Sequence, residues 1–105
     1  QIKNYLLKRG FKSINVGRLD FLDQISLFNN AKIIVGPHGA AFTNLIFCKK
    51  NTKVIEIKPA NRPNNFKEIS KAHNLIYKQI VTPPIKKNKI NGDIFLKPQQ
   101  LSKLI

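Results

Sequence analysis

The apolar residues of this 105-residue chain recur at two spacings, one typical of helices and one typical of strands. Residues 20–30 place Phe21, Ile25 and Phe28 on one face of a helix. Residues 33–35 instead form an unbroken β-branched run, which is typical of a strand buried on both faces of a parallel sheet. The two spacings follow each other along most of the chain, so we expect helices and strands to alternate.

The whole pattern predicts five helices and five strands. The predicted helices cover residues 1–9, 20–30, 40–47, 65–73 and 98–104. The predicted strands cover residues 11–16, 32–35, 53–58, 75–81 and 93–96, with a polar loop at 82–92. Such alternation implies right-handed crossovers and a parallel sheet with helices on both faces. We therefore expect one Rossmann-like α/β domain spanning residues 1–105. The chain opens at Gln1 inside a predicted helix, which indicates a fragment of a longer protein.

The segment with the most distinctive chemistry follows the strand that ends at Gly36. It reads Gly36-Pro37-His38-Gly39-Ala40-Ala41 and leads into the predicted helix at 40–47. Ligands of open parallel sheets bind beyond the carboxyl ends of strands, and a helix N-terminus offers free N–H groups to a diphosphate. His38 can donate a hydrogen bond or a charge to phosphate, and Thr43 and Asn44 can add contacts. The alternative is a turn that merely needs glycine, with His38 as its cap, and spacing alone leaves both open.

Glu56 is a carboxylate inside an apolar strand, twenty positions after Gly36. In dinucleotide-binding folds an acidic residue about 20 positions on accepts hydrogen bonds from ribose. A structural salt bridge to a lysine is the alternative, because a buried carboxylate needs partners. The full Gly-x-Gly-x-x-Gly fingerprint is absent, which argues against an oxidoreductase domain that binds NAD.

Charge and metal-binding patterns change this picture little. The net charge of +14 fits a surface that binds nucleic acid or another polyanion. The lysines are scattered, however, and only three of the 19 cations are arginines, so we favour a bias in composition. Cys48 is expected to be a small buried apolar residue. His38 and His73 show no metal-ligand spacing, so no metal site is predicted, and a departing diphosphate would be neutralised by a helix dipole and basic side chains.

Residues 35–48, followed by 52–57, resemble the signature of glycosyltransferase family 61. That family includes bacterial capsular-polysaccharide enzymes, plant arabinosyl and xylosyl transferases, and animal O-linked GlcNAc transferases. Residues 19–28 resemble the family's preceding helix, with Asp23-Gln24 where Glu-Gln is usual. Two departures stand out. Ala41 replaces a frequent glycine, and Lys50-Asn51 stands where the family usually has Pro-Gly.

The resemblance implies an inverting, metal-independent glycosyltransferase built from two Rossmann domains (the GT-B type). This chain would be the C-terminal, donor-binding lobe, taking a nucleoside-diphosphate sugar as substrate and no permanently bound cofactor. Residues matching the donor-diphosphate turn are Gly36, His38, Gly39, Ala40 and Ala41, with His38 as the candidate catalytic residue, and Glu56 matches the family's acidic strand residue.

The rest of the implied enzyme lies outside this chain. The glycan acceptor would bind through an N-terminal lobe, so the isolated fragment is expected to be inactive. The implied setting is polysaccharide biosynthesis in the cytoplasm, where the enzyme could attach peripherally to a membrane. No specific nucleic-acid partner is expected. The competing hypothesis is a basic polyanion-binding module without catalysis.

Overall fold

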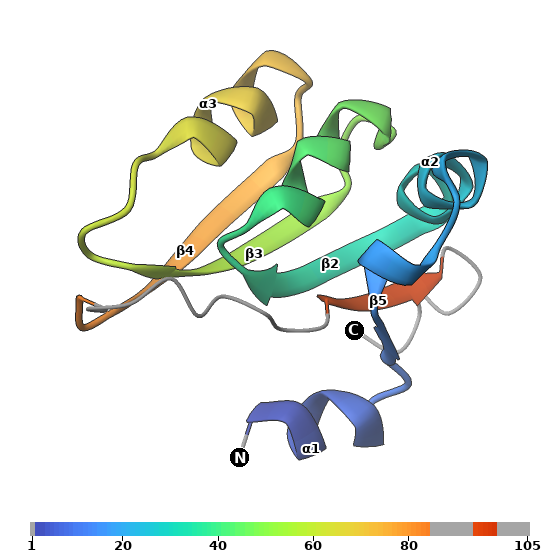
Figure 1. Cartoon of the computed structure of the whole chain (residues 1–105), viewed down its shortest axis with the longest axis horizontal. Helices are drawn as coiled ribbons and strands as arrows, with labels where there is room; N and C mark the ends of the chain where they lie inside the picture. Colours follow the sequence, from blue (N-terminus) through green and yellow to red (C-terminus); the bar gives the residue numbers. More distant parts are fainter. Residues whose placement is uncertain (1, 85–93, 99–105) are drawn as a thin grey trace.

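The computed structural model describes residues 2–84 and 94–98, and its elements alternate between helix and strand (Figure 1). In chain order they are α1 (Ile2–Lys8), β1 (Lys12–Ile14), the short 3₁₀ helix η1 (Val16–Arg18), α2 (Phe21–Asn30), β2 (Ala31–Pro37), the 3₁₀ helix η2 (Ala40–Phe47), β3 (Lys53–Pro59), α3 (Asn65–Ala72), β4 (Ile76–Thr82) and β5 (Ile94–Pro98). Each predicted element within these residues is present, although η1 was not predicted. The helix predicted from Pro98 onward, and most of the predicted 82–92 loop, lie outside the described residues.

The five strands form one mixed sheet in the order β1-β5-β2-β3-β4. Strands β2, β3 and β4 are parallel, as predicted. β5 runs antiparallel to both of its neighbours, β1 and β2, so the prediction of a wholly parallel sheet is wrong. β4 ends at Thr82 opposite Pro59, and β5 begins beside the end of β2, where Phe95 pairs with Val35. The end of β4 and the start of β5 therefore lie at the same side of the sheet, where the parallel strands end. From there β5 runs back antiparallel to β2.

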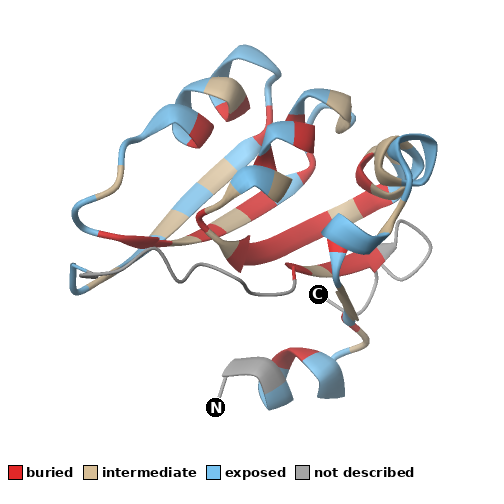
Figure 2. Ribbon diagram, in the orientation of Figure 1, coloured by how far each residue is buried: buried red, intermediate tan, exposed pale blue. Residues whose placement is uncertain are grey.

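Helices lie on both faces of the sheet, but they cover the two faces unequally. α2, η2 and α3 pack on one face, and α1 lies on the other (Figure 1). On β2, Ile34 belongs to the core beneath the three helices, whereas Ile33 and Val35 pack with residues of the α1 side. α1 does not reach across β4, where Ile76 and Ile80 are each 44% exposed. Figure 2 shows the resulting contrast between a buried β2 and a largely exposed β4.

Local sequence signals explain where two of the helices begin and end. The Asp20 side chain accepts a hydrogen bond from the backbone N–H of Asp23, so it caps α2 as predicted. α1 ends at Lys8, and Gly10, two residues further on, has a φ of 86°. The N–H of Phe11 donates to the Leu6 carbonyl and the N–H of Gly10 to the Leu7 carbonyl, a Schellman motif.

The ammonium of Lys97 ties the end of α1 to strand β5 of the sheet. Lys97 lies on β5, is fully buried, and donates to the carbonyl oxygen of Arg9 over 2.5 Å. A cation at the end of a helix satisfies a free carbonyl and complements the helix dipole. Within residues 2–84 and 94–98, no helix has the length and apolar character needed to cross a bilayer.

Candidate functional site

The segment Pro37–Ala41 lies at the carboxyl ends of the parallel strands β2 and β3, where the sequence predicted a ligand-binding turn. Gly36 pairs with Glu56 in the β2–β3 ladder. Beyond the last pair, the N–H of His38 donates to the carbonyl oxygen of Ile57 over 2.9 Å. The backbone of His38 is therefore fixed against the end of β3, and its side chain starts close to that of Glu56.

His38 and Glu56 form a buried pair. Nδ1 of His38 lies 2.5 Å from Oε2 of Glu56. Glu56 is fully buried and His38 is 9% exposed. Phe66 of α3 packs against the imidazole, with ring centroids 5.0 Å apart and planes tilted by 54°. A carboxylate oxygen accepts hydrogen bonds, so Nδ1 is the donor and carries a ring proton. In the neutral ring this leaves Nε2 with a lone pair.

Nε2 of His38 is the nitrogen that remains accessible to a ligand. It makes no hydrogen bond to any residue that the structure describes. Because it is not one of the fully buried nitrogen and oxygen atoms that lack a partner, this atom is partly exposed. A neutral imidazole presents a lone pair at Nε2, and a protonated one presents an N–H. This atom can therefore receive a proton from a ligand or donate a hydrogen bond to one.

Tyr77 completes the arrangement and was not recognised in the sequence. Its hydroxyl donates a hydrogen bond to Oε1 of Glu56. Burial raises the pKa of Tyr77 well above its ordinary value, and the hydrogen bond with Glu56 raises it further, so the phenol keeps its proton and acts as donor. Both oxygens of Glu56 are thus engaged by side chains of this chain. That arrangement differs from each predicted partner of Glu56, a ribose hydroxyl or a lysine.

Gly36 is explained by packing. A Cβ at this position would lie 2.8 Å from Cγ2 of Ile94 and 3.2 Å from Cε1 of Phe42. The residue therefore lets β2 pass closely beneath η2 and beside β5, a sufficient reason for glycine without any ligand. Gly39 differs, because its backbone is extended (φ 171°, ψ 178°), a conformation that other residues also adopt.

The start of η2 offers the N–H groups that the sequence predicted. The N–H of Phe42 donates to the Gly39 carbonyl, and the Thr43 hydroxyl donates to the Ala40 carbonyl over 2.8 Å. The N–H groups of Ala40 and Ala41 make no hydrogen bond to a described residue. Free N–H groups and a positive helix end at this position suit an anion. The helix predicted at 40–47 is present, and it is a 3₁₀ helix.

The two polar residues predicted to assist the turn differ in where they point. Thr43 is exposed on the first turn of η2. Asn44 is buried, and its amide donates to Oε1 of Gln24 in α2 over 2.9 Å. The structure thus brings Thr43 to the turn and directs Asn44 to a neighbouring helix.

Two further sequence expectations concern Cys48 and metals. Burial raises the pKa of the Cys48 thiol from 9.0 to about 12, so the group is protonated and unreactive at neutral pH, as expected of a small apolar residue. His, Cys, Asp and Glu side chains gather in no group of three or more in the described parts of the chain.

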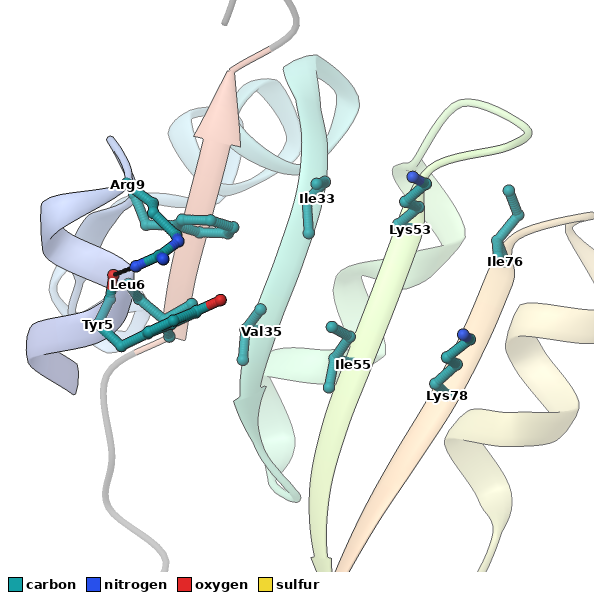
Figure 3. A pocket seen from close by; sticks show the side chains of 10 residues that line it. Tyr5, Leu6, Arg9, Ile33, Val35, Lys53, Ile55, Ile76 and Lys78 are labelled. Carbon is teal, nitrogen blue, oxygen red and sulfur yellow. Dashed lines mark hydrogen bonds between the residues drawn. The ribbon is translucent and has the colours of Figure 1, made fainter. Parts of the chain in front are cut away.

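A groove of about 460 Å³ lies on the opposite face of the sheet, between α1 and β4 (Figure 3). Its floor is formed by Ile33, Val35 and Ile55, and Lys53 and Lys78 stand at its rim. None of the predicted site residues lines it, and neither does any acid or histidine. We therefore place the candidate chemistry at the open turn rather than in this groove.

Comparisons with known proteins show what the chain is similar to. The EGF domain-specific O-linked N-acetylglucosamine transferase of Drosophila melanogaster is 27% identical over 71 residues, which cover 68% of this chain and 14% of that protein. No solved structure matches the chain. The family model of Glycosyltransferase 61 matches residues 1–55, more than half of the chain and including the His38 turn. This chain belongs to glycosyltransferase family 61.

Proposed function

We propose that this chain is the donor-binding lobe of a glycosyltransferase and that the Pro37–Ala41 turn holds the diphosphate of a nucleotide sugar. The observation that carries the proposal is the pair formed by His38 and Glu56, 2.5 Å apart, beside the free N–H groups of Ala40 and Ala41. This combination supplies one side-chain group and two backbone donors at the carboxyl ends of the parallel strands β2 and β3. Family membership supports the same assignment.

The proposed chemistry is the transfer of a sugar from diphosphate to an acceptor hydroxyl. A bond forms between the acceptor oxygen and the anomeric carbon while the bond from that carbon to the phosphate oxygen breaks. The electron pair leaves with the diphosphate, and the acceptor proton passes to a base outside this chain. Attack from the side opposite the leaving group inverts the anomeric centre.

His38 and the start of η2 would stabilise the charge that develops on the leaving diphosphate. Preorganised donors aimed at developing charge lower the barrier because they need no reorganisation during the reaction. Glu56 supports this role by accepting from Nδ1, which keeps Nε2 available and stabilises a protonated ring. We assign Glu56 to holding His38, since both of its oxygens are already engaged.

The remaining parts of the proposal follow the family rather than particular contacts. The chain would be the C-terminal Rossmann-like lobe of a GT-B enzyme, with the glycan acceptor bound by an N-terminal lobe. Neutralisation by His38 and helix N–H groups would make a divalent cation unnecessary. The setting would be polysaccharide biosynthesis on the cytoplasmic side, with peripheral attachment to a membrane.

The test is calorimetric titration of this chain with UDP, GDP, CDP and NAD at moderate salt. We expect saturable binding of one nucleoside diphosphate, and His38→Ala should weaken it about tenfold or more, equivalent to about 1.4 kcal/mol. His73→Ala is the matched control, because His73 is the other histidine and is exposed at the end of α3. Equal affinity in wild type and His38→Ala would refute the assigned role.

The competing function, a polyanion-binding module, is favoured by the +14 net charge alone. It predicts binding to any polyanion, falling steeply as salt increases because counterions are released. Titration with a nucleic-acid duplex and with the nucleoside diphosphates at two salt concentrations separates the two functions. Duplex binding that weakens steeply with salt but is still measurable at physiological salt, with none for a nucleotide, would favour the module.

A further inference from the structure

We propose that Tyr77 is a positioning residue for His38, acting through Glu56. The Tyr77 hydroxyl holds one oxygen of the Glu56 carboxylate, so that the other oxygen accepts from Nδ1–H of His38 and Nε2 faces the ligand. The use of Nε2 by a diphosphate rests on the proposed function. The positioning itself is a property of the unliganded chain.

The hydrogen bonds join three neighbouring segments and converge on Glu56. Tyr77 lies on β4, Glu56 on β3, and His38 follows β2. Gln79 is the β4 residue paired with Glu56. Tyr77 lies two positions before it and therefore on the same face of the sheet. Each Glu56 oxygen has one donor, Tyr77 on Oε1 and His38 on Oε2.

A fully buried carboxylate makes the Tyr77 hydroxyl important for the pair. Glu56 has no exposure, so an oxygen that loses its donor is left unsatisfied inside the protein. The carboxylate would then gain by turning its free oxygen toward another donor, and His38 would lose its fixed partner. The hydrogen bond of the partnered nitrogen sets the tautomer of a neutral histidine. If the Glu56 carboxylate is no longer fixed, both tautomers of His38 become populated.

Packing alone does not set this tautomer. Phe66 packs against the His38 ring with its plane tilted by 54°, but an apolar ring treats both nitrogens alike. The Tyr77 phenol is a dependable donor, because burial and the hydrogen bond with Glu56 raise its pKa. The proton position on His38 therefore depends on the polar contacts.

The test is ¹⁵N NMR of the imidazole nitrogens in the whole chain without ligand. Only two histidines contribute, and exposed His73 serves as the internal reference. In the wild type we expect neutral His38 to carry its proton on Nδ1. Tyr77→Phe removes only the hydroxyl and should raise the fraction protonated on Nε2 several-fold. Tyr5→Phe is the matched control, since Tyr5 is the other tyrosine and is exposed.

Glu56→Gln gives a second test, in which the His38 proton should move to Nε2 more completely. The Tyr77 hydroxyl would donate to the amide oxygen, which turns the amide NH₂ toward Nδ1 of His38. Nδ1 must then accept, so neutral His38 should carry its proton on Nε2. Adding Tyr77→Phe to Glu56→Gln should return a mixture of tautomers. A His38 tautomer that is the same in wild type and in folded Tyr77→Phe or Glu56→Gln protein would overturn the proposal.

A nucleotide titration of the same variants separates this proposal from the proposed function. In the proposed function the diphosphate accepts a hydrogen bond from Nε2–H of the protonated ring, which Glu56 stabilises best while Tyr77 holds its carboxylate in place. We therefore expect Tyr77→Phe to weaken nucleoside diphosphate binding about three- to tenfold, and Tyr5→Phe to leave it unchanged. A tautomer change without any nucleotide binding in wild type would support the positioning and refute the donor site. Binding that depends on His38, with Tyr77→Phe changing neither measurement, would refute the positioning and keep the donor site.

Discussion

Asn44 donates a hydrogen bond from Nδ2 to Oε1 of Gln24 over 2.9 Å, and this bond joins η2 to α2. The Gln24 amide in turn donates to the carbonyl oxygens of Val16 and Leu19. Gln24 thus bridges the entry to α2 and the helix that follows the His38 turn. The Asn44 side chain is therefore engaged in holding η2 against α2, beside the candidate site.

Asn44→Ala is therefore expected to lower stability and leave nucleotide affinity unchanged. The substitution leaves the Gln24 oxygen without its buried donor, which costs about 1–3 kcal/mol of unfolding free energy. Urea unfolding measures this loss. Thr43→Ala is the control on the same helix and should change stability by less than about 0.5 kcal/mol, because Thr43 is exposed. A loss of nucleotide binding in folded Asn44→Ala would contradict the structural role.

Gly36→Ala is expected to destabilise the chain by about 1–3 kcal/mol through overpacking. The added methyl would sit 2.8 Å from Cγ2 of Ile94, so β5 or η2 has to shift. Gly17→Ala provides the comparison, since its Cβ meets only Oδ1 of Asn15 at 3.5 Å, an ordinary contact. Equal urea midpoints for the two variants would show that the Gly36 site has room for a side chain.

The unequal covering of the sheet predicts different costs for the same substitution on its two faces. Ile34 is fully buried beneath the helices, and Ile34→Val should cost about 0.5–1.5 kcal/mol. Ile76 is 44% exposed on β4, and Ile76→Val should change stability by less than about 0.5 kcal/mol. Chemical denaturation of both variants checks the difference. A larger loss at Ile76 would mean that something covers the β4 face.

The raised pKa of Cys48 predicts slow alkylation that continues to accelerate at high pH. The thiolate is the reactive form, and a pKa of about 12 instead of 9.0 reduces its amount about a thousandfold at about pH 8. Alkylation by iodoacetamide should be at least about a hundredfold slower in the native chain than in urea. Its rate should rise about tenfold per pH unit through about pH 9–11, and a plateau near pH 9 would contradict the assignment.

Local patterns predicted the elements of the fold but not the direction of every strand. The caps at Asp20 and Gly10 and the apolar run of β2 are properties of neighbouring residues, so they can be read from the sequence. The direction of β5 depends on whether it starts beside the beginning or the end of β2, and no local pattern predicts this. The type of η2 also escaped prediction, because eight residues are too few to separate a period of three from one of 3.6.

The candidate site was predictable residue by residue but not as a set of contacts. Gly36, His38 and Glu56 stand out because each is unusual in its segment. Their pairing needs the register between β2 and β3, and Tyr77 needs that between β3 and β4. A tyrosine within a strand is otherwise an ordinary strand former. Its role becomes visible only when the sheet places its hydroxyl on a buried carboxylate.

The position of β5 between β1 and β2 has a consequence for the order in which the chain folds. β1 joins the sheet only through β5, and the bond from Lys97 to Arg9 spans 88 positions. A chain emerging from a ribosome can therefore assemble β2, β3 and β4 early, while α1 and β1 wait until β5 has been synthesised. Such long-range closure slows folding. Translation that stops before β5 would leave a nascent chain with its first and second strands unconnected, a substrate for chaperones and proteases.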